Sequence, residues 1–145
     1  MRNRNSRSRS REFALQGFYE WVLSNNDPSA ISARIAQSEG FDGCDVPYFD
    51  RLWSGITREY RSLLSALSPF CNRSTDALSP IEKGVLVIGA WELLHEPEVP
   101  YRVAIDEGVE LAKSYGGTDG HKFVNGVLDK LAATARPRDA SAARV

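Results

Sequence analysis

The chain has 145 residues, of which 42% are hydrophobic and 26% charged, and its formal net charge at neutral pH is −1. This composition is typical of a folded globular protein, and the length suits one domain with its own hydrophobic core. Two cysteines 27 positions apart exclude a disulfide framework, and with two histidines they form no zinc-binding pattern, so we expect reduced thiols in a cytoplasmic protein. No apolar run reaches the roughly 20 residues of a membrane span, and the amino end lacks the apolar core of a secretory signal.

Residues 1–11 concentrate positive charge. They hold five arginines and no acidic residue, whereas the rest of the chain holds 13 basic against 19 acidic side chains, a net charge of −6. Arginine without lysine favours bidentate contact with phosphate. A terminal block of one sign is equally typical of a solvated arm that only improves solubility, so both interpretations stay open.

Three helices are predicted in the first half of the chain. Apolar residues at helical spacing predict a helix over residues 8–24 and a short one over residues 29–38. Asp45 is a candidate cap for a longer helix over residues 47–67, which has proline in its first turn. A polar connector then predicts a boundary between two halves at about residue 77.

The second half begins with a strong helix-start signal. In Ser79-Pro80-Ile81-Glu82, the serine can cap, the proline suits the first turn, and the glutamate can return a hydrogen bond to the cap amide. The helix that follows, to about His95, is apolar almost all round, so we expect it at the centre of the fold. Glu92 lies within it, and a carboxylate there must find hydrogen bonds or a cation.

Two further helices complete the prediction. One carries an apolar stripe from Tyr101 to Tyr115 and is closed by a pair of glycines; the last starts after a cap at Thr118 or Asp119. No strand-like alternation competes with these helices, so the fold class is all-α. We therefore expect a basic arm over residues 1–11, an all-α domain over residues 12–135 with halves 12–77 and 78–135, and a flexible tail over residues 136–145.

The last helix has a distinctive exposed face. Lys122, Asn125 and Asp129 share the side opposite the apolar stripe, and Gly126 near them costs about 1 kcal/mol relative to alanine. A glycine at that position indicates close approach of another backbone, from a helix or a ligand. Phe123, at the edge of the stripe, is either edge-of-core packing or a ring available to stack on a base.

The sequence offers no support for catalysis. It contains no GxSxG, HExxH, P-loop or GxGxxG motif. Cys71 has no evident base and is expected to be a small buried residue, and His95 is expected to have a structural role at a helix end. We therefore expect a protein that is not an enzyme and that holds no cofactor or metal.

Several segments together resemble one family. They are residues 7–12 (RSRSRE), 14–16 (ALQ), 19–21 (YEW), 48–49 (YF), 55–56 (GI), 81–83 (IEK), 88–94 (IGAWELL), 99–105 (VPYRVAI), 110–113 (ELAK) and 121–130 (HKFVNGVLDK). Over about residues 6–132 the chain resembles the NusB family of bacterial transcription antitermination factors, and the last of these segments is highly specific. The resemblance implies about six to seven helices in two packed helical subdomains.

The resemblance also implies a function. Family members pair with NusE, a small-subunit ribosomal protein, and bind boxA RNA in nascent ribosomal-RNA transcripts. The complex joins the elongating RNA polymerase with other Nus factors and suppresses premature termination. About five arginines predict modest, salt-sensitive RNA affinity for the chain alone, and its acidic remainder suits a basic partner.

The RNA contacts of the family carry over onto matching positions of this chain. They are Arg7, Arg9, Arg11, Gln16 and Tyr19 near the start, with Lys122, Phe123 and Asn125 in the last helix. The NusE-facing surface should include Glu82 and Trp91. The chain departs from the family at Val87, where many members carry arginine, at Trp91, where tyrosine is common, and at Asp106, where asparagine is usual. These departures bear on RNA affinity and on the partner contacts.

Other functions stay open at this point. The main alternative is a protein–protein adaptor whose basic arm contacts no RNA. Similar domains also guide ribosomal-RNA methyltransferases, but no catalytic region is found here, and no helix is basic enough to favour sequence-specific DNA binding. The free chain is a monomer or a homodimer, and the sequence decides neither this nor the bases read.

Overall fold

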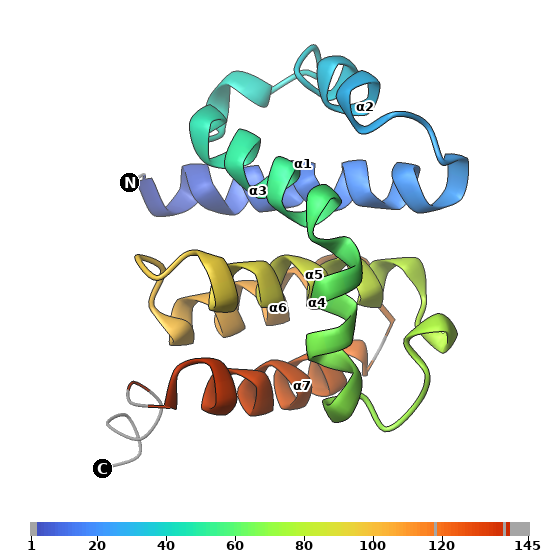
Figure 1. Cartoon of the computed structure of the whole chain (residues 1–145). Helices are drawn as coiled ribbons and strands as arrows, with labels where there is room; N and C mark the ends of the chain where they lie inside the picture. The colour runs from blue at the N-terminus through green and yellow to red at the C-terminus, as the bar shows by residue number, and fades with distance from the viewer. Residues whose placement is uncertain (1–2, 118, 138, 140–145) are drawn as a thin grey trace.

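Seven α-helices make up most of the described chain, which comprises residues 3–117, 119–137 and 139 of the computed structural model (Figure 1). They are α1 (Asn3–Ser24), α2 (Pro28–Ile35), α3 (Val46–Arg58), α4 (Tyr60–Leu67), α5 (Pro80–His95), α6 (Tyr101–Tyr115) and α7 (Gly120–Ala135). Short 3-10 turns lie at Phe41–Gly43, Ser68–Phe70 and Thr75–Ala77. These described residues contain no strand, and the predicted all-α class is confirmed.

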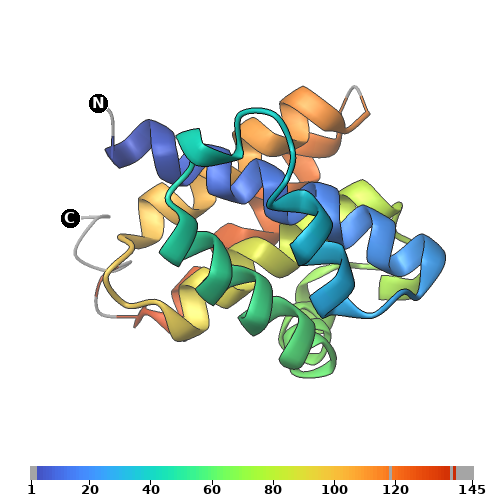
Figure 2. The same cartoon turned by 90° about the horizontal axis from the view of Figure 1, so that it is seen from above.

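Helix α5 is the centre of the fold. It packs against α1, α3, α4, α6 and α7, and every residue from 84 to 93 is buried. Figure 1 shows α1, α2 and α3 above α5 and α6, with α7 below, and Figure 2 shows α1 and α3 side by side from above. The prediction that a helix apolar all round is central is confirmed.

The helix starts are fixed by local hydrogen bonds. At α5, Ser79 Oγ accepts from the Glu82 N–H at 3.2 Å and Glu82 Oε1 accepts from the Ser79 N–H at 3.5 Å, which is the predicted capping box. At α3, Asp45 Oδ1 accepts from the Tyr48 N–H at 3.1 Å, as predicted. Asp119 precedes α7, but its side chain makes no capping hydrogen bond, and Thr118 lies outside the described residues.

The predicted long helix over residues 47–67 is wrong in one respect, because it is broken at Glu59 into α3 and α4. The break lets Tyr60 pack its ring on Phe18 and Trp21 of α1, with centroids 5.8 and 5.2 Å apart. Beyond it, α4 packs on α5 and α7. Since α4 precedes residue 77 yet packs on the later helices, a boundary at that residue stays a prediction.

The predicted flexible tail begins with a residue that is held in place. Arg136, just after α7, donates to the carbonyls of Leu93, Glu92, Glu96 and Val99 at distances of 2.5 to 3.1 Å. These carbonyls belong to the end of α5 and the loop after it, so Arg136 caps that helix end. Residues 138 and 140–145 of the predicted tail lie outside the described residues.

Helices α3 and α5 are in close contact at Gly55 of α3. A Cβ built there would overlap the indole of Trp91 on α5, which lies directly on the glycine backbone. By contrast, a Cβ built on Gly126 of α7 meets no atom within 4 Å. The same chemical change at these two helical glycines therefore has opposite consequences.

We expect Gly55→Ala to lower the free energy of unfolding by about 2 kcal/mol, because overpacking against a fixed ring outweighs the gain in helix propensity. Gly126→Ala is the matched control and should raise the free energy of unfolding by about 0.5–1 kcal/mol. Urea denaturation followed by circular dichroism measures both. A stabilising effect of Gly55→Ala would show that α3 and α5 can move apart at little cost.

Candidate nucleic-acid interface

The basic segment is part of a helix rather than a separate arm. Helix α1 begins at Asn3, not at the predicted residue 8, so helical periodicity distributes its arginines around the axis. Arg7 and Arg11, about one turn apart, face the body of the protein. Arg9 lies on roughly the opposite side of the helix and its side chain is 47% exposed. Only one of these three arginines is therefore directed to solvent.

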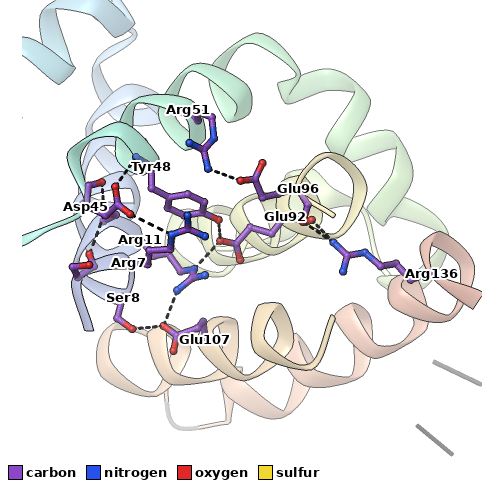
Figure 3. Close-up of polar contacts among 12 residues, drawn as sticks. Arg7, Ser8, Arg11, Asp45, Tyr48, Arg51, Glu92, Glu96, Glu107 and Arg136 are labelled. Carbon is purple, nitrogen blue, oxygen red and sulfur yellow. Dashed lines mark hydrogen bonds and ion pairs between the residues drawn. The ribbon is translucent and has the colours of Figure 1, made fainter. Parts of the chain in front are cut away.

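Arg11 enters a buried polar cluster that Figure 3 shows between α1, α3, α5 and α6. Its Nε donates to Glu92 Oε2 at 2.7 Å, and its Nη1 pairs with Glu107 Oε1 at 3.2 Å. The Tyr48 hydroxyl donates to the same Glu92 oxygen. Burial raises the pKa of the Glu92 carboxyl, with Arg11 and Tyr48 opposing that shift. Glu92 thus finds the cation that its place in an apolar helix demanded.

Arg7 lies at the outer edge of this cluster. Its Nε pairs with Asp45 Oδ2 at 3.3 Å, and its guanidinium stacks over the Tyr48 ring, 4.3 Å from the centroid. Burial, and then the Glu92 carboxylate, raise the pKa of the Tyr48 hydroxyl, so it stays protonated and donates. Arg7 is half-buried and keeps part of its surface in solvent.

The RNA contact predicted for Arg11 stays a prediction, but the burial and pairing of the side chain argue against it. Its side chain is only 3% exposed and is paired with two carboxylates. Reaching a phosphate would break both ion pairs and leave Glu92 buried without its cation. The sequence places Arg11 in an arginine-rich run, and only its distant partners show that it faces inward.

A groove of about 390 Å³ brings three of the predicted RNA-binding residues together. Arg9, Gln16 and Tyr19 line it from one side of α1, as their spacing of seven and ten residues indicates. Its other lining residues are Glu12, Phe13, Leu15, Glu39, Ile81 and Tyr115. Tyr19 is 44% exposed and Tyr115 is 50% exposed, so two aromatic rings are available at this surface.

Sequence reasoning missed part of this groove. Tyr115 was assigned to the apolar stripe of α6, but it is half-exposed because it stands in the last turn, where the helix leaves the core. Its position next to Gly116 was the signal that could have shown this. Glu12 Oε1 lies 3.4 Å from Arg9 Nε. Glu39 adds a second carboxylate to the groove lining. No local pattern marked either of them.

The predicted residues of α7 do not line the groove, although the start of α7 lies near one of its lining segments. A Cβ built on Gly120, the first residue of α7, would lie 3.4 Å from Glu82 Oε2, and Ile81 beside Glu82 lines the groove. Lys122 is exposed and pairs with Asp119 at 3.5 Å, and Asn125 is exposed.

The structure shows how Phe123 and Gly126 pack within the chain, while a contact of either residue with RNA or a partner stays a prediction. Phe123 is partly buried, with the Arg73 guanidinium 4.4 Å from its ring centroid, which is edge-of-core packing. No other part of the described chain approaches the Cβ position of Gly126, so packing by another helix of this chain does not explain that glycine. Approach of a ligand or partner to Gly126 stays a prediction.

The two predicted partner residues differ in accessibility. Trp91 is 7% exposed, lies against Gly55 and contacts the Tyr48 ring edge-on, so its side chain is buried in the free chain, and a role for it in NusE binding stays a prediction. The Glu82 carboxylate caps α5 and lies 3.6 Å from Arg73, and it is partly exposed. A role for Glu82 in partner binding stays a prediction.

The described part of the chain gives little support for a reactive thiol, a metal site or a membrane-spanning helix. Cys71 is fully buried, donates to the Leu67 carbonyl at 3.3 Å, and has its pKa raised by burial, as expected of a structural thiol. Within the residues described, no cluster of three or more His, Cys, Asp or Glu side chains is suitable for a metal ion. Among the same residues, no helix has the length and apolar character to span a bilayer.

Comparison with known proteins decides the family. The model of the NusB family matches residues 8–133. The chain belongs to the NusB family. This NusB-family chain is 49% identical over 141 residues to transcription antitermination protein NusB of Burkholderia ambifaria, covering 97% of each chain. It is 47% identical to that of Cupriavidus pinatubonensis, covering 97% of this chain and 84% of the relative.

Solved structures support the same fold. T. maritima NusB superposes with a TM-score of 0.81 and 28% identity, covering 92% of this chain and 95% of that one. A crystal structure of antitermination factors NusB and NusE in complex with dsRNA gives a TM-score of 0.78 at 22% identity, and the match covers 90% of this chain and 98% of the chain in that structure. The expected NusB-like fold is confirmed, and the NusB family is one of transcription antitermination factors, not of enzymes.

Proposed function

We propose that this chain binds unpaired RNA along α1 and acts with NusE as an antitermination factor. The RNA is boxA in nascent ribosomal-RNA transcripts, and the complex acts in the cytoplasm on elongating RNA polymerase together with other Nus factors. Relatives with nearly half of their residues identical carry the name of transcription antitermination protein NusB. A protein of similar fold, NusB, has been crystallised with NusE in complex with dsRNA.

The observation that carries the proposal is the groove along α1. It combines an arginine, an amide and two half-exposed tyrosine rings, which are Arg9, Gln16, Tyr19 and Tyr115. Aromatic rings stack on unpaired bases, amides bond base edges, and guanidinium groups bind phosphate or stack. The carboxylates of Glu12 and Glu39 repel phosphate groups inside the groove. The groove therefore suits the bases of an RNA strand, with the sugar-phosphate backbone of the RNA outside it.

The charge distribution favours a partner-assisted complex. Arg11 is paired with buried carboxylates and the half-buried Arg7 is paired with Asp45, which leaves fewer unpaired cations for phosphate than the sequence alone indicates. The chain without its first 11 residues carries a net charge of −6, from 13 basic and 19 acidic side chains. A basic protein such as a ribosomal protein complements that surface and supplies further phosphate contacts.

Arg9→Ala and Tyr19→Ala are each expected to weaken boxA RNA binding by the heterodimer with NusE about tenfold, through loss of a charged contact or of one base stack. Fluorescence anisotropy with a labelled boxA oligonucleotide at two salt concentrations measures this. Arg9→Ala should also reduce the salt slope by about 0.7, the value of one contact to single-stranded RNA. Arg61→Ala, an exposed arginine on α4, is the matched control and should change neither quantity.

The same titration tests the adaptor alternative. If Arg9→Ala and Tyr19→Ala leave RNA affinity unchanged while NusE binding persists, the chain is an adaptor and the groove is not its RNA site. If addition of NusE gives no gain in RNA affinity, the partner-assisted part of the proposal is wrong.

A further inference from the structure

We infer that Arg11, through its buried pairing with Glu92, is a positioning residue that sets the rotation and register of the first turns of α1. This places Arg9 and Gln16 at the groove without any contact between Arg11 and RNA. The inference rests on the proposed function in one respect only, namely that Arg9 contacts RNA. Its structural content can be tested without RNA.

The first turns of α1 have no apolar anchor. Residues 3–11 (NRNSRSRSR) contain no hydrophobic side chain, and the first buried apolar residue of the helix is Phe13. An isolated segment of this composition does not hold a helix in water. Polar contacts with the rest of the protein must therefore order it.

Those contacts converge on one loop and two helices. Ser10 Oγ donates to the Asp45 carbonyl at 2.8 Å, and the Asp45 N–H donates to the Ser6 carbonyl at 3.1 Å. Ser8 Oγ donates to Glu107 Oε1 at 2.8 Å. Within this network, Arg11 is the guanidinium buried deepest, at 3% exposure, and it bridges α5 and α6 by pairing with both Glu92 and Glu107.

Helical geometry transmits this anchoring to Arg9. Two residues before Arg11, Arg9 projects to roughly the opposite side of α1, so the direction in which Arg11 is held decides the direction of Arg9. Gln16 stands two turns from Arg9 on the groove side. If α1 rotated by one residue, both side chains would leave the groove together.

The pair is also poorly suited to a purely stabilising role. Glu92 is fully buried, and its Oε1 has no hydrogen-bond partner among the described residues. Replacing such an ion pair by apolar side chains of similar size is often neutral or stabilising. A directional guanidinium–carboxylate contact, however, accepts one geometry, whereas an apolar contact tolerates sliding and rotation. This is the property that a positioning role requires.

The test replaces both partners at once, in Arg11→Met with Glu92→Leu. We expect a folded protein with nearly unchanged NusE affinity, about tenfold faster amide exchange over residues 6–11, and about tenfold weaker binding of boxA RNA with NusE present. Arg51→Met with Glu96→Leu is the matched control. It removes another Arg–Glu pair, 2.6 Å apart between α3 and α5, that holds no part of α1, and it should leave all three quantities unchanged.

A double-mutant cycle separates positioning from direct contact and from simple stabilisation. Adding Arg9→Ala to the Arg11→Met, Glu92→Leu protein should cost little further RNA affinity, because Arg9 is already misplaced. Additive losses would overturn the inference, since they would mean that Arg11 acts independently of Arg9. Unchanged amide exchange over residues 6–11 would overturn it without reference to RNA. If Arg9→Ala alone has no effect on RNA binding, the proposed function fails, and the exchange measurement still decides the positioning role.

Discussion

Replacing Glu92 by alanine is expected to lower the free energy of unfolding by about 3 kcal/mol, the lower end of the cost of losing one half of a buried ion pair. The Glu92 carboxylate accepts hydrogen bonds from both Arg11 and Tyr48, so its removal leaves two buried donors without that acceptor. Glu107 continues to pair with Arg11 at 3.2 Å, which limits the loss. Urea denaturation followed by tryptophan fluorescence measures the change.

Glu110→Ala is the control for this truncation. Glu110 is exposed on α6 and pairs with Lys113 at 3.7 Å, so its loss should change the free energy of unfolding by less than about 0.5 kcal/mol. A loss below about 1 kcal/mol for Glu92→Ala would mean that water reaches Arg11 and replaces the carboxylate. The contrast with the Arg11→Met, Glu92→Leu protein is informative, because breaking a buried ion pair is costly, whereas replacing both partners by apolar side chains is often neutral or stabilising.

Leu128→Ala is expected to destabilise the protein by about 4–5 kcal/mol, the upper part of the range for buried leucine. Leu128 on α7 fills space between α5 and α6 that two glycines leave open. Cβ atoms built on Gly89 and Gly108 would lie 2.8 and 2.9 Å from its Cδ1. Because neither glycine has a side chain that can move into the vacated space, the cavity should persist.

Leu23→Ala provides the comparison for Leu128→Ala. Leu23 is an exposed leucine near the end of α1, and its truncation should cost less than about 0.5 kcal/mol. Both variants can be followed by thermal and urea denaturation. A loss of less than about 2 kcal/mol for Leu128→Ala would show that α5, α6 and α7 collapse onto the site.

Several features of this fold were predictable because their causes lie within a few residues of one another. The Ser79 and Glu82 capping box, the Asp45 cap and the central position of α5 all follow from local hydrogen bonding or from uninterrupted apolar composition. Arg9 and Gln16 stand seven residues apart, about two helical turns, and the structure has both of them lining the same groove. The capping and spacing rules act within one or two turns, so no tertiary information was needed.

Whether individual aromatic side chains are buried or exposed was less predictable. Trp91 was expected at a partner surface but is buried on Gly55, and Tyr115 was expected in the core but is exposed in the groove. Neither residue type has a fixed preference, because an aromatic ring is stable in the core or at a half-exposed edge. The packing of other helices decides between these positions.

The sequence by itself determined that this chain is all-α, where most of its helices start, and that Glu92 requires a partner. Only the tertiary structure decided that the partner is Arg11, which lies 81 positions away in the chain. The same contact turns one arginine of the basic segment inward while its neighbour Arg9 faces solvent. Helix formation depends on residues within a turn, whereas the burial of a charge depends on which opposite charge the folded chain brings beside it.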